Sequence, residues 1–324
     1  MVSRKPVPSP GRRSPDRLSP RFELEAVLAS VVGVRARIPE DATTAATLGT
    51  ERSGSGVCIH ERGLVLTVSY LICEAEEIWL RTADGRVVPG HVLACDFESG
   101  LGLIQAHGEL GCAPSEFGSA ARLRVGARVW LAAAGGREAA LSGVLVARRE
   151  FAGYWEYWLE EALFVAPAHP HWGGAGLFDE DGHLVGMGLL FVETGEAARP
   201  DRMTMAVPVD LLPPILDDLV YRGRRRTPPV PWLGLHVAET ANGLVIAAVL
   251  PGSPAERAGL EVGDRIFEVA GVPVAELGDF LRQVRALGPA GTAVPLRILR
   301  DDARLTVEAI SADRNDFLRR PDLH

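Results

Sequence analysis

The sequence contains no run of about 20 apolar residues, the length that an α-helix needs to cross a bilayer. Aromatic residues are scarce at 6%, whereas the 324 residues include 35 glycines and 23 prolines. This composition favours many short strands joined by turns over long helices. Basic residues are not in excess, since the net charge is −8, and this argues against a nucleic-acid partner. We therefore expect a mainly β protein without a membrane span.

The four cysteines, Cys58, Cys73, Cys95 and Cys112, lack the C-x-x-C spacing that is typical of metal ligands. In a cytoplasmic protein such thiols stay reduced and are largely buried. A pair formed by Cys58 and Cys73, which flank a predicted hairpin, is the less favoured alternative.

Three histidines lie close together in the sequence, at His169, His171 and His183. They lack a tight ligand pattern such as H-E-x-x-H, so we interpret them as solvated loop residues, with a metal site as the less favoured alternative. The sequence thus predicts no metal and no cofactor.

The two ends of the chain have the composition of poorly ordered segments. Residues 1–23 are basic and rich in proline and serine, which is typical of disorder, and the charged residues 313–324 are expected to fray. Arg12 and Arg13 form a pair as in a twin-arginine signal, but no apolar run follows them. The sequence as it stands predicts no export signal and a cytoplasmic location, whereas a different start that supplied a signal peptide would make the protein periplasmic or secreted.

Short apolar runs separated by turn residues fill residues 24–209, in two series of about six joined by residues 108–121. Runs of this length and spacing indicate β-barrels or a β-sandwich, and their periodicity alone does not distinguish the two. Residues 210–231 then read as a short helix followed by a linker rich in arginine and proline, which we attribute to a solvated spacer. Residues 232–312 follow as a smaller α+β unit.

Within this last unit, WLGL (232–235), PGSPAERAGLEVGD (251–264) and an amphipathic helix at 276–287 occur in order. They resemble the PDZ domain that follows the protease domain in HtrA (Do-like) proteins. A PDZ domain accepts a peptide as an added β-strand and holds its terminal carboxylate with the N–H groups of a turn, so the resemblance implies that protein or peptide C-termini are partners. Helix periodicity alone equally allows the apolar helix residues to fill the core. The predicted peptide-binding residues are Trp232, Leu233, Gly234, Leu235, His236 and Val237 in the turn and strand, and Phe280, Leu281 and Val284 on the helix.

Three further motifs occur in order before this unit: GSGVCIHERGLVLTVSYLI (54–72), DGRVVPGHVLACDFESGLGLI (84–104) and HPHWGGAGLF (169–178). They resemble the chymotrypsin-like protease domain of the HtrA family. The resemblance implies a double β-barrel over residues 24–209, with one barrel at about 24–107 and the other at about 122–209.

The positions of the family's catalytic histidine, aspartate and serine are Tyr70, Gly100 and Gly173 in this sequence. A tyrosine with a pKa near 10 cannot act as a base at neutral pH, and glycine offers neither a nucleophile nor a carboxylate. A shift in the alignment does not restore the nucleophile, because no serine lies between Ser142 and Ser253. Loss of such a triad costs about 10⁶ in turnover. The resemblance therefore implies a pseudoprotease.

Parts of the former cleft are expected to remain. The resemblance implies a vestigial cleft, and we use this name for Gly174, Met205, Ala206 and Val207. The backbone N–H groups of Gly173 and Gly174 are expected to face a bound carbonyl, as in an oxyanion hole. Alternation along the aromatic cluster at residues 154–158 predicts one aromatic pair in the barrel core and the other pair exposed or simply packed.

The sequence therefore predicts a non-catalytic HtrA-like protein that binds extended or C-terminal peptide segments through its PDZ domain. It would act as an adaptor, scaffold or regulator in protein quality control or proteolysis, with an active HtrA-type protease as a further partner. The resemblance also implies a trimer. The alternative is an HtrA-like serine-type endopeptidase with divergent or residual hydrolase activity.

Overall fold

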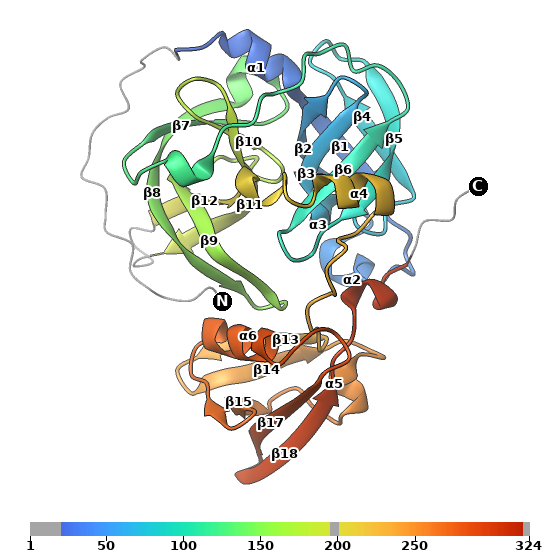
Figure 1. Ribbon diagram of the computed structural model, residues 1–324, viewed down its shortest axis with the longest axis vertical. Helices are drawn as coiled ribbons and strands as arrows, with labels where there is room; N and C mark the ends of the chain where they lie inside the picture. The colour runs from blue at the N-terminus through green and yellow to red at the C-terminus, as the bar shows by residue number, and fades with distance from the viewer. Residues whose placement is uncertain (1–20, 195–200, 320–324) are drawn as a thin grey trace. The chain divides into compact units, whose positions relative to one another are not determined.

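The computed structural model describes residues 21–194 and 201–319 (Figure 1). The predicted disorder of residues 1–20 and the predicted fraying of 320–324 lie outside this part. The described residues divide into two compact units. The barrel unit comprises residues 21–149, 161–194, 201–225 and 319, and the PDZ unit comprises residues 150–160 and 226–318.

The first barrel is a closed antiparallel sheet, and its strands form where apolar and polar residues alternate. In β1, for example, Val32, Val34 and Ala36 are buried while Arg35 and Arg37 are exposed. The strands follow the order β1 (Val31–Arg37), β2 (Glu51–His60), β3 (Leu64–Val68), β6 (Leu101–Ala106), β5 (Val87–Cys95) and β4 (Glu77–Arg81). Three short helices accompany this barrel: α1 (Leu24–Ser30), α2 (Ala45–Leu48) and α3 (Ser69–Ile72).

The second barrel is also closed, and its core is built from fully buried side chains such as Leu131, Leu145 and Leu177. The two closed barrels confirm the predicted double barrel and exclude a sandwich for this region. The strands follow the order β10 (Gly176–Phe178), β11 (Leu184–Thr194), β12 (Asp201–Pro208), β9 (Tyr157–Ala166), β8 (Ala140–Gly153) and β7 (Arg128–Ala132). The 3₁₀ turns η1 (Ala120–Arg122) and η2 (Gly136–Ala139) lie close to β7 in the sequence, one before it and one after it.

The helix that we expected to begin at Asp210 is interrupted. The chain forms a 3₁₀ turn, η3 (Val209–Leu211), and a separate helix, α4 (Leu216–Arg222). Pro213 and Pro214 lie between them, and proline both lacks an N–H donor and disfavours helical geometry in the residue before it. Gly223 ends α4 in the left-handed conformation, with φ of 70°.

The PDZ unit contains a six-stranded sheet and two helices. Its sheet follows the order β13 (Leu235–Thr240), β14 (Gly243–Val249), β15 (Arg265–Val269), β17 (Ala293–Arg300) and β18 (Ala303–Ile310), with β16 (Val272–Pro273) paired to β15. The helices are α5 (Pro254–Arg257) and α6 (Leu277–Ala286), and η4 (Arg314–Phe317) follows the sheet. The predicted fraying is wrong for η4, because the Phe317 ring packs 4.8 Å from the ring of Trp232 and the Asp313 side chain caps the turn.

The four thiols are free, and the less favoured alternative, a pair of Cys58 and Cys73, is not formed. Cys58 and Cys112 share a hydrogen bond, which lowers the pKa of Cys58 to about 7. The sulfur of Cys73 instead lies 3.3 Å from the Arg52 guanidinium. The structure therefore places Cys112, and not Cys73, beside Cys58.

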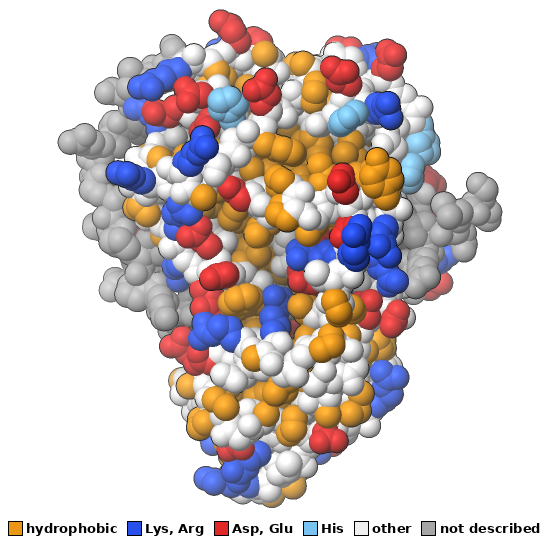
Figure 2. Space-filling model, viewed as in Figure 1, with side chains coloured by type: hydrophobic (Ala, Val, Ile, Leu, Met, Phe, Trp, Pro, Cys, Tyr) orange, Lys and Arg blue, Asp and Glu red, His pale blue; other side chains and the backbone are white. Residues whose placement is uncertain are grey.

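No helix among the described residues has the length and apolar character needed to cross a membrane. On the face drawn in Figure 2, basic and acidic side chains are intermixed over the described residues.

Candidate functional site

Tyr70 fills the space where a catalytic side chain at position 173 would stand. A Cβ atom built on Gly173 would lie only 2.6 Å from the Tyr70 hydroxyl oxygen. This hydroxyl also accepts a hydrogen bond from the Trp172 indole, since indole nitrogen is a donor only. Burial raises the pKa of Tyr70 to about 12, so its hydroxyl keeps its proton at neutral pH. Tyr70 therefore acts as a packed, neutral side chain in this position.

The backbone that follows Gly173 fits closely against barrel one. Gly174 has φ of 74°, and a Cβ atom there would lie 1.9 Å from the carbonyl oxygen of Ser55. The Gly174 N–H donates to the carbonyl of Gly188 at 2.8 Å. This N–H is therefore used inside the protein, and the expected pair of donors for a substrate carbonyl is not formed.

His169 is buried, which corrects its interpretation as a solvated loop residue. Its side chain is only 2% exposed. The His171 N–H donates to Nδ1 of His169 at 3.0 Å, so the ring carries its proton on Nε2, which donates to the Ala139 carbonyl at 3.1 Å. Burial lowers the pKa of His169. The ring is held neutral with both nitrogens bonded, and neither is free to take a proton from a nucleophile.

Gly100 and its neighbours form a structural turn. Gly100 has φ of 79°, and its carbonyl accepts a hydrogen bond from the Ser69 N–H at 2.8 Å. The nearby Asp96 carboxylate accepts bonds from the Ser99 hydroxyl and N–H, and from Arg225 through two bonds of 2.7 Å each. Ser99 and Asp96 are thus both engaged in the fold, and Gly100 cannot orient an imidazole.

The vestigial cleft is closed. Met205, Ala206 and Val207 lie in β12, which pairs with β9 on one side and β11 on the other. Each of these three side chains is 0% exposed. The resemblance implies a cleft at these residues, but their side chains are inaccessible because they form part of the core of barrel two.

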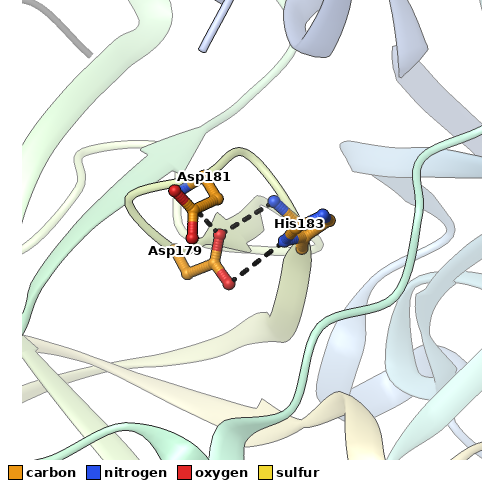
Figure 3. Close-up of side chains that lie close together, drawn as sticks. All are labelled: Asp179, Asp181 and His183. Atoms are coloured by element: carbon orange, nitrogen blue, oxygen red, sulfur yellow. Dashed lines mark hydrogen bonds and ion pairs between the residues drawn. The ribbon is translucent and has the colours of Figure 1, made fainter. Parts of the chain in front are cut away.

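The third histidine, His183, lies in an acidic turn between β10 and β11. Figure 3 shows its ring beside Asp179, with Asp181 in the same turn. Nδ1 of His183 is 3.5 Å from the Asp179 carboxylate, and the other Asp179 oxygen accepts the N–H groups of Asp181 and His183 at 3.0 and 2.9 Å. These bonds to backbone N–H groups are typical of a tight Asx turn, and they account for the arrangement without a ligand.

The turn predicted to bind a terminal carboxylate already binds the side-chain carboxylate of Glu156. The N–H groups of Leu233, Gly234 and Leu235 donate to Glu156 at 2.8, 2.6 and 2.7 Å. Gly234 has φ of 83°, and a Cβ atom there would lie 2.3 Å from Cβ of Ser253, so the turn requires glycine. Burial raises the pKa of Glu156 despite these three donors, which lower it.

Tyr154, two residues before Glu156, lies beside β13. The Val237 N–H donates to the Tyr154 carbonyl at 2.8 Å, and the Tyr154 ring meets the His236 ring edge-on at 5.2 Å. The segment thus runs from Tyr154 beside the strand to Glu156 at the turn. This is the direction in which a peptide would end its chain at the turn.

The helix residues of the predicted groove are buried. Phe280, Leu281 and Val284 are 0%, 4% and 2% exposed and belong to the core cluster of the PDZ unit. The same cluster includes Ala152 and packs against Trp158, which both come from the hairpin formed by β8 and β9. In this structure the helix face therefore contributes to the core and is covered by the hairpin.

The sequence did not reveal Glu156 as part of this site. Residues 154–156 form a turn, with Glu156 at a φ of 60°, so the alternation expected of a strand does not hold across the aromatic cluster. Tyr154 is 38% exposed and Tyr157 is buried, and both belong to the PDZ unit and not to the barrel core. The only local signal is an acidic residue between aromatic residues at a hairpin tip, which does not specify a partner 77 residues away.

Two family models match the chain: the trypsin-like peptidase domain over residues 54–187 and the PDZ domain over residues 245–300. A putative serine protease HhoA from Synechocystis sp. is 26% identical, over 80% of this chain and 70% of the relative. The serine endoprotease DegS from Escherichia coli is 27% identical, over 79% of this chain and 75% of the relative. A probable periplasmic serine endoprotease DegP-like from Pseudomonas fulva is 26% identical over 79% of this chain, which spans only 54% of that relative.

Solved structures agree with the fold. The HtrA-type protease AlgW with decapeptide has a TM-score of 0.53 at 17% identity and covers 92% of this chain and 98% of that one. A serine endoprotease from Yersinia pestis has a TM-score of 0.52 at 21% identity, covering 89% and 96%.

The relatives also overturn the predicted cytoplasmic location. The Pseudomonas fulva relative is named periplasmic, and this points to the periplasm and not to the cytoplasm. The sequence-based prediction was wrong because it relied on the lack of a signal at the start of the chain. The chain carries a trypsin-like peptidase domain followed by a PDZ domain, and its domain order and fold are like those of HtrA-type proteases.

Proposed function

We propose that this protein is a non-catalytic HtrA-like protein that binds extended or C-terminal peptide segments through its PDZ domain. The observation that carries the proposal is the position of Tyr70, whose hydroxyl lies 2.6 Å from where a side chain at residue 173 would begin. A serine nucleophile needs both a side chain at this point and a base within hydrogen-bond reach. This chain provides Gly173 and a tyrosine with a raised pKa.

Peptide binding is supported by the geometry of the PDZ turn. Three consecutive N–H groups, from Leu233 to Leu235, converge on one carboxylate within 2.6–2.8 Å. Charge-assisted bonds of this kind are the stronger class of hydrogen bond, and a turn that offers three of them suits a terminal carboxylate. The adjacent β13 has an N–H group at Val237 that can bond to an added strand.

An alternative is that the protein is an HtrA-like serine-type endopeptidase with divergent or residual activity. The peptidase family match and the relatives named serine proteases favour this alternative more directly than they favour a loss of activity. It requires a nucleophile and a base from outside the three positions implied by the resemblance.

One experiment separates these two functions. The full chain is incubated with a fluorescent fluorophosphonate probe and, separately, with casein, beside a heat-denatured sample and an active trypsin. We expect labelling and casein cleavage no greater than in the denatured sample. Labelling of the native chain above that sample would reject the non-catalytic function.

Peptide binding is tested on an array of random decapeptides synthesised with either a free carboxylate or an amide at the C-terminus. We expect binders tighter than about 1 mM, equivalent to −4.1 kcal/mol, and we expect each free carboxylate to bind more tightly than the corresponding amide. The Gly234→Leu variant should lose them, with a thermal melt to confirm folding. An array without such binders would reject this function.

We further propose that the chain assembles as a trimer and that an active HtrA-type protease is a partner, in a role in protein quality control or proteolysis. The resemblance to HtrA proteins supports both proposals. Mass photometry of the protein, alone and mixed with an active HtrA-type protease, tests both: a strict monomer would reject the trimer, and no mixed species would reject the partner.

A further inference from the structure

We propose that the tip of the β8–β9 hairpin, residues 153–157, is an internal ligand of the PDZ domain. A peptide C-terminus would then bind only after it displaces Glu156 from the turn. This inference rests on the proposed peptide-binding function and adds its regulation. The internal ligand is chemically similar to the external one, since each presents a carboxylate to the same turn, Glu156 from the tip of a hairpin and the peptide from its C-terminus.

The first argument is that the turn has no further donors for a second carboxylate. The N–H groups of Leu233, Gly234 and Leu235 are all bonded to Glu156, two of them to the same oxygen. Each of these N–H groups has one hydrogen. An incoming carboxylate therefore competes with Glu156 for the same three hydrogens, and the two cannot both be bound there.

The second argument is that the strand edge is also taken. The Val237 N–H is bonded to the Tyr154 carbonyl, and the Tyr154 ring lies against His236. An added strand from an external peptide needs this same N–H. The hairpin thus occupies both elements by which a PDZ domain holds a peptide: the carboxylate turn and the edge of β13.

The third argument is that contacts with the helix α6 also hold the hairpin in place. Glu150 forms an ion pair with Arg282 and accepts a hydrogen bond from the Trp158 indole at 2.8 Å. The guanidinium of Arg285 lies 5.2 Å from the centre of the Trp158 ring. The hairpin therefore contacts both sides of the groove, β13 on one side and α6 on the other.

The contact at the tip has features of a reversible one. Glu156 adopts a φ of 60°, which is uncommon for residues other than glycine, asparagine and aspartate. Tyr154 remains 38% exposed, and the ion pair between Glu150 and Arg282 is partly exposed to solvent. Exposed pairs contribute little to stability, whereas Tyr157 and Ala152 are buried, so a peptide has to displace Glu156 and Tyr154 and can leave the buried part of the hairpin in place.

The test uses the full chain and the Glu156→Ala and Glu156→Gln variants on the same arrays of free-carboxylate and amidated decapeptides. The matched control is Glu160→Ala, which removes an exposed glutamate from the same hairpin. A peptide binds only to the fraction of molecules in which Glu156 has left the turn, and removing Glu156 raises the apparent affinity for peptide by the reciprocal of that fraction. We therefore expect Glu156→Ala to bind peptide about 10- to 100-fold more tightly. Glu160→Ala should bind as the unmodified chain does, and the amidated array should show no gain.

The outcomes separate this inference from the proposed function. Equal binding by the unmodified chain and by Glu156→Ala would overturn the internal ligand while leaving peptide binding intact. No binding by either protein would reject peptide binding itself. Hydrogen exchange gives a second readout without any peptide: the amides of residues 233–235 should exchange faster in Glu156→Ala than in Glu160→Ala, and unchanged exchange would overturn the inference.

Discussion

The close approach of Tyr70 to Gly173 allows the packing between these two residues to be measured as a difference in the free energy of unfolding. A Cβ atom at position 173 would lie 2.6 Å from the Tyr70 hydroxyl oxygen but 3.7 Å from the ring carbon that carries it. Gly173 has no positive φ, so alanine is allowed by its backbone. The first distance forces the ring or the loop to move, whereas the second is an ordinary van der Waals contact.

We therefore expect Gly173→Ala to destabilise the chain by about 1–3 kcal/mol, the usual cost of inserting a methyl group into a packed core. In a Tyr70→Phe background the cost of the same change should fall to less than about 1 kcal/mol, because the nearest atom is then the ring carbon. Tyr70→Phe alone should cost about 1 kcal/mol for the lost hydrogen bond from Trp172. The double variant should therefore lose about 1–2 kcal/mol less stability than the sum of the two single losses.

The assay is urea unfolding of the four proteins in this cycle, followed by tryptophan fluorescence. Gly108→Ala serves as a matched control, because its Cβ atom would meet the nearest neighbour at 3.5 Å and its φ is not positive. An equal cost of Gly173→Ala with and without the Tyr70 hydroxyl would refute the claim that this oxygen occupies the nucleophile's place.

Three further predictions concern the surroundings of this centre. Gly174→Ala should destabilise the barrel unit by more than about 3 kcal/mol, measured by urea unfolding, because its Cβ atom would lie 1.9 Å from the Ser55 carbonyl at a positive φ; a loss below about 1 kcal/mol would contradict the close approach of the two backbones. Because burial lowers the pKa of His169, the unfolded state takes up its proton first, so stability should fall as the pH drops below about 6.5, by at most about 1.4 kcal/mol per pH unit. Unfolding curves at pH 7, 6 and 5 should show this slope, and His169→Asn should lack it; identical slopes would exclude His169 as the cause. Arg225→Ala should cost about 3–5 kcal/mol in thermal or urea unfolding, because it leaves the buried Asp96 carboxylate without its partner, and Arg225→Ala/Asp96→Ala should recover part of that loss.

The parts of this fold that were predictable are those specified by neighbouring residues. The alternation in β1 and the turn glycines fix strands to within a residue or two, because each pattern describes which face of one strand is buried. The PDZ turn was also predictable, because the short motif WLGL places Gly234 where the turn needs a positive φ. The positions of Tyr70 and Gly173 relative to each other followed only from the resemblance, since 103 residues separate them in the sequence.

The features that were not predictable depend on distant partners. The sequence around His169 is rich in proline and glycine, which indicates a loop and therefore a solvated histidine, but its ring is enclosed by Ala139 and by the loop itself. The order of residues 313–318 depends on the contact of Phe317 with Trp232. Glu156 looks like any exposed acidic residue in the sequence, and only the folded PDZ unit shows the three donors that it meets.

The chain's own side chains fill both of its candidate sites, but the two contacts differ in their physical character. The Tyr70 hydroxyl is buried with a pKa of about 12, and the loop it touches is held by Gly174, whose backbone leaves no room for a side chain. Opening this centre would break the packing of Tyr70 against the loop, and neither Tyr70 nor Gly173 would then offer an activated nucleophile. The PDZ turn is filled by a single carboxylate at a partly exposed hairpin tip, and another carboxylate can replace the same three bonds one for one. The catalytic centre is therefore closed by packing, whereas the peptide site is closed by a competitor, and only the second kind of closure can be reversed by binding.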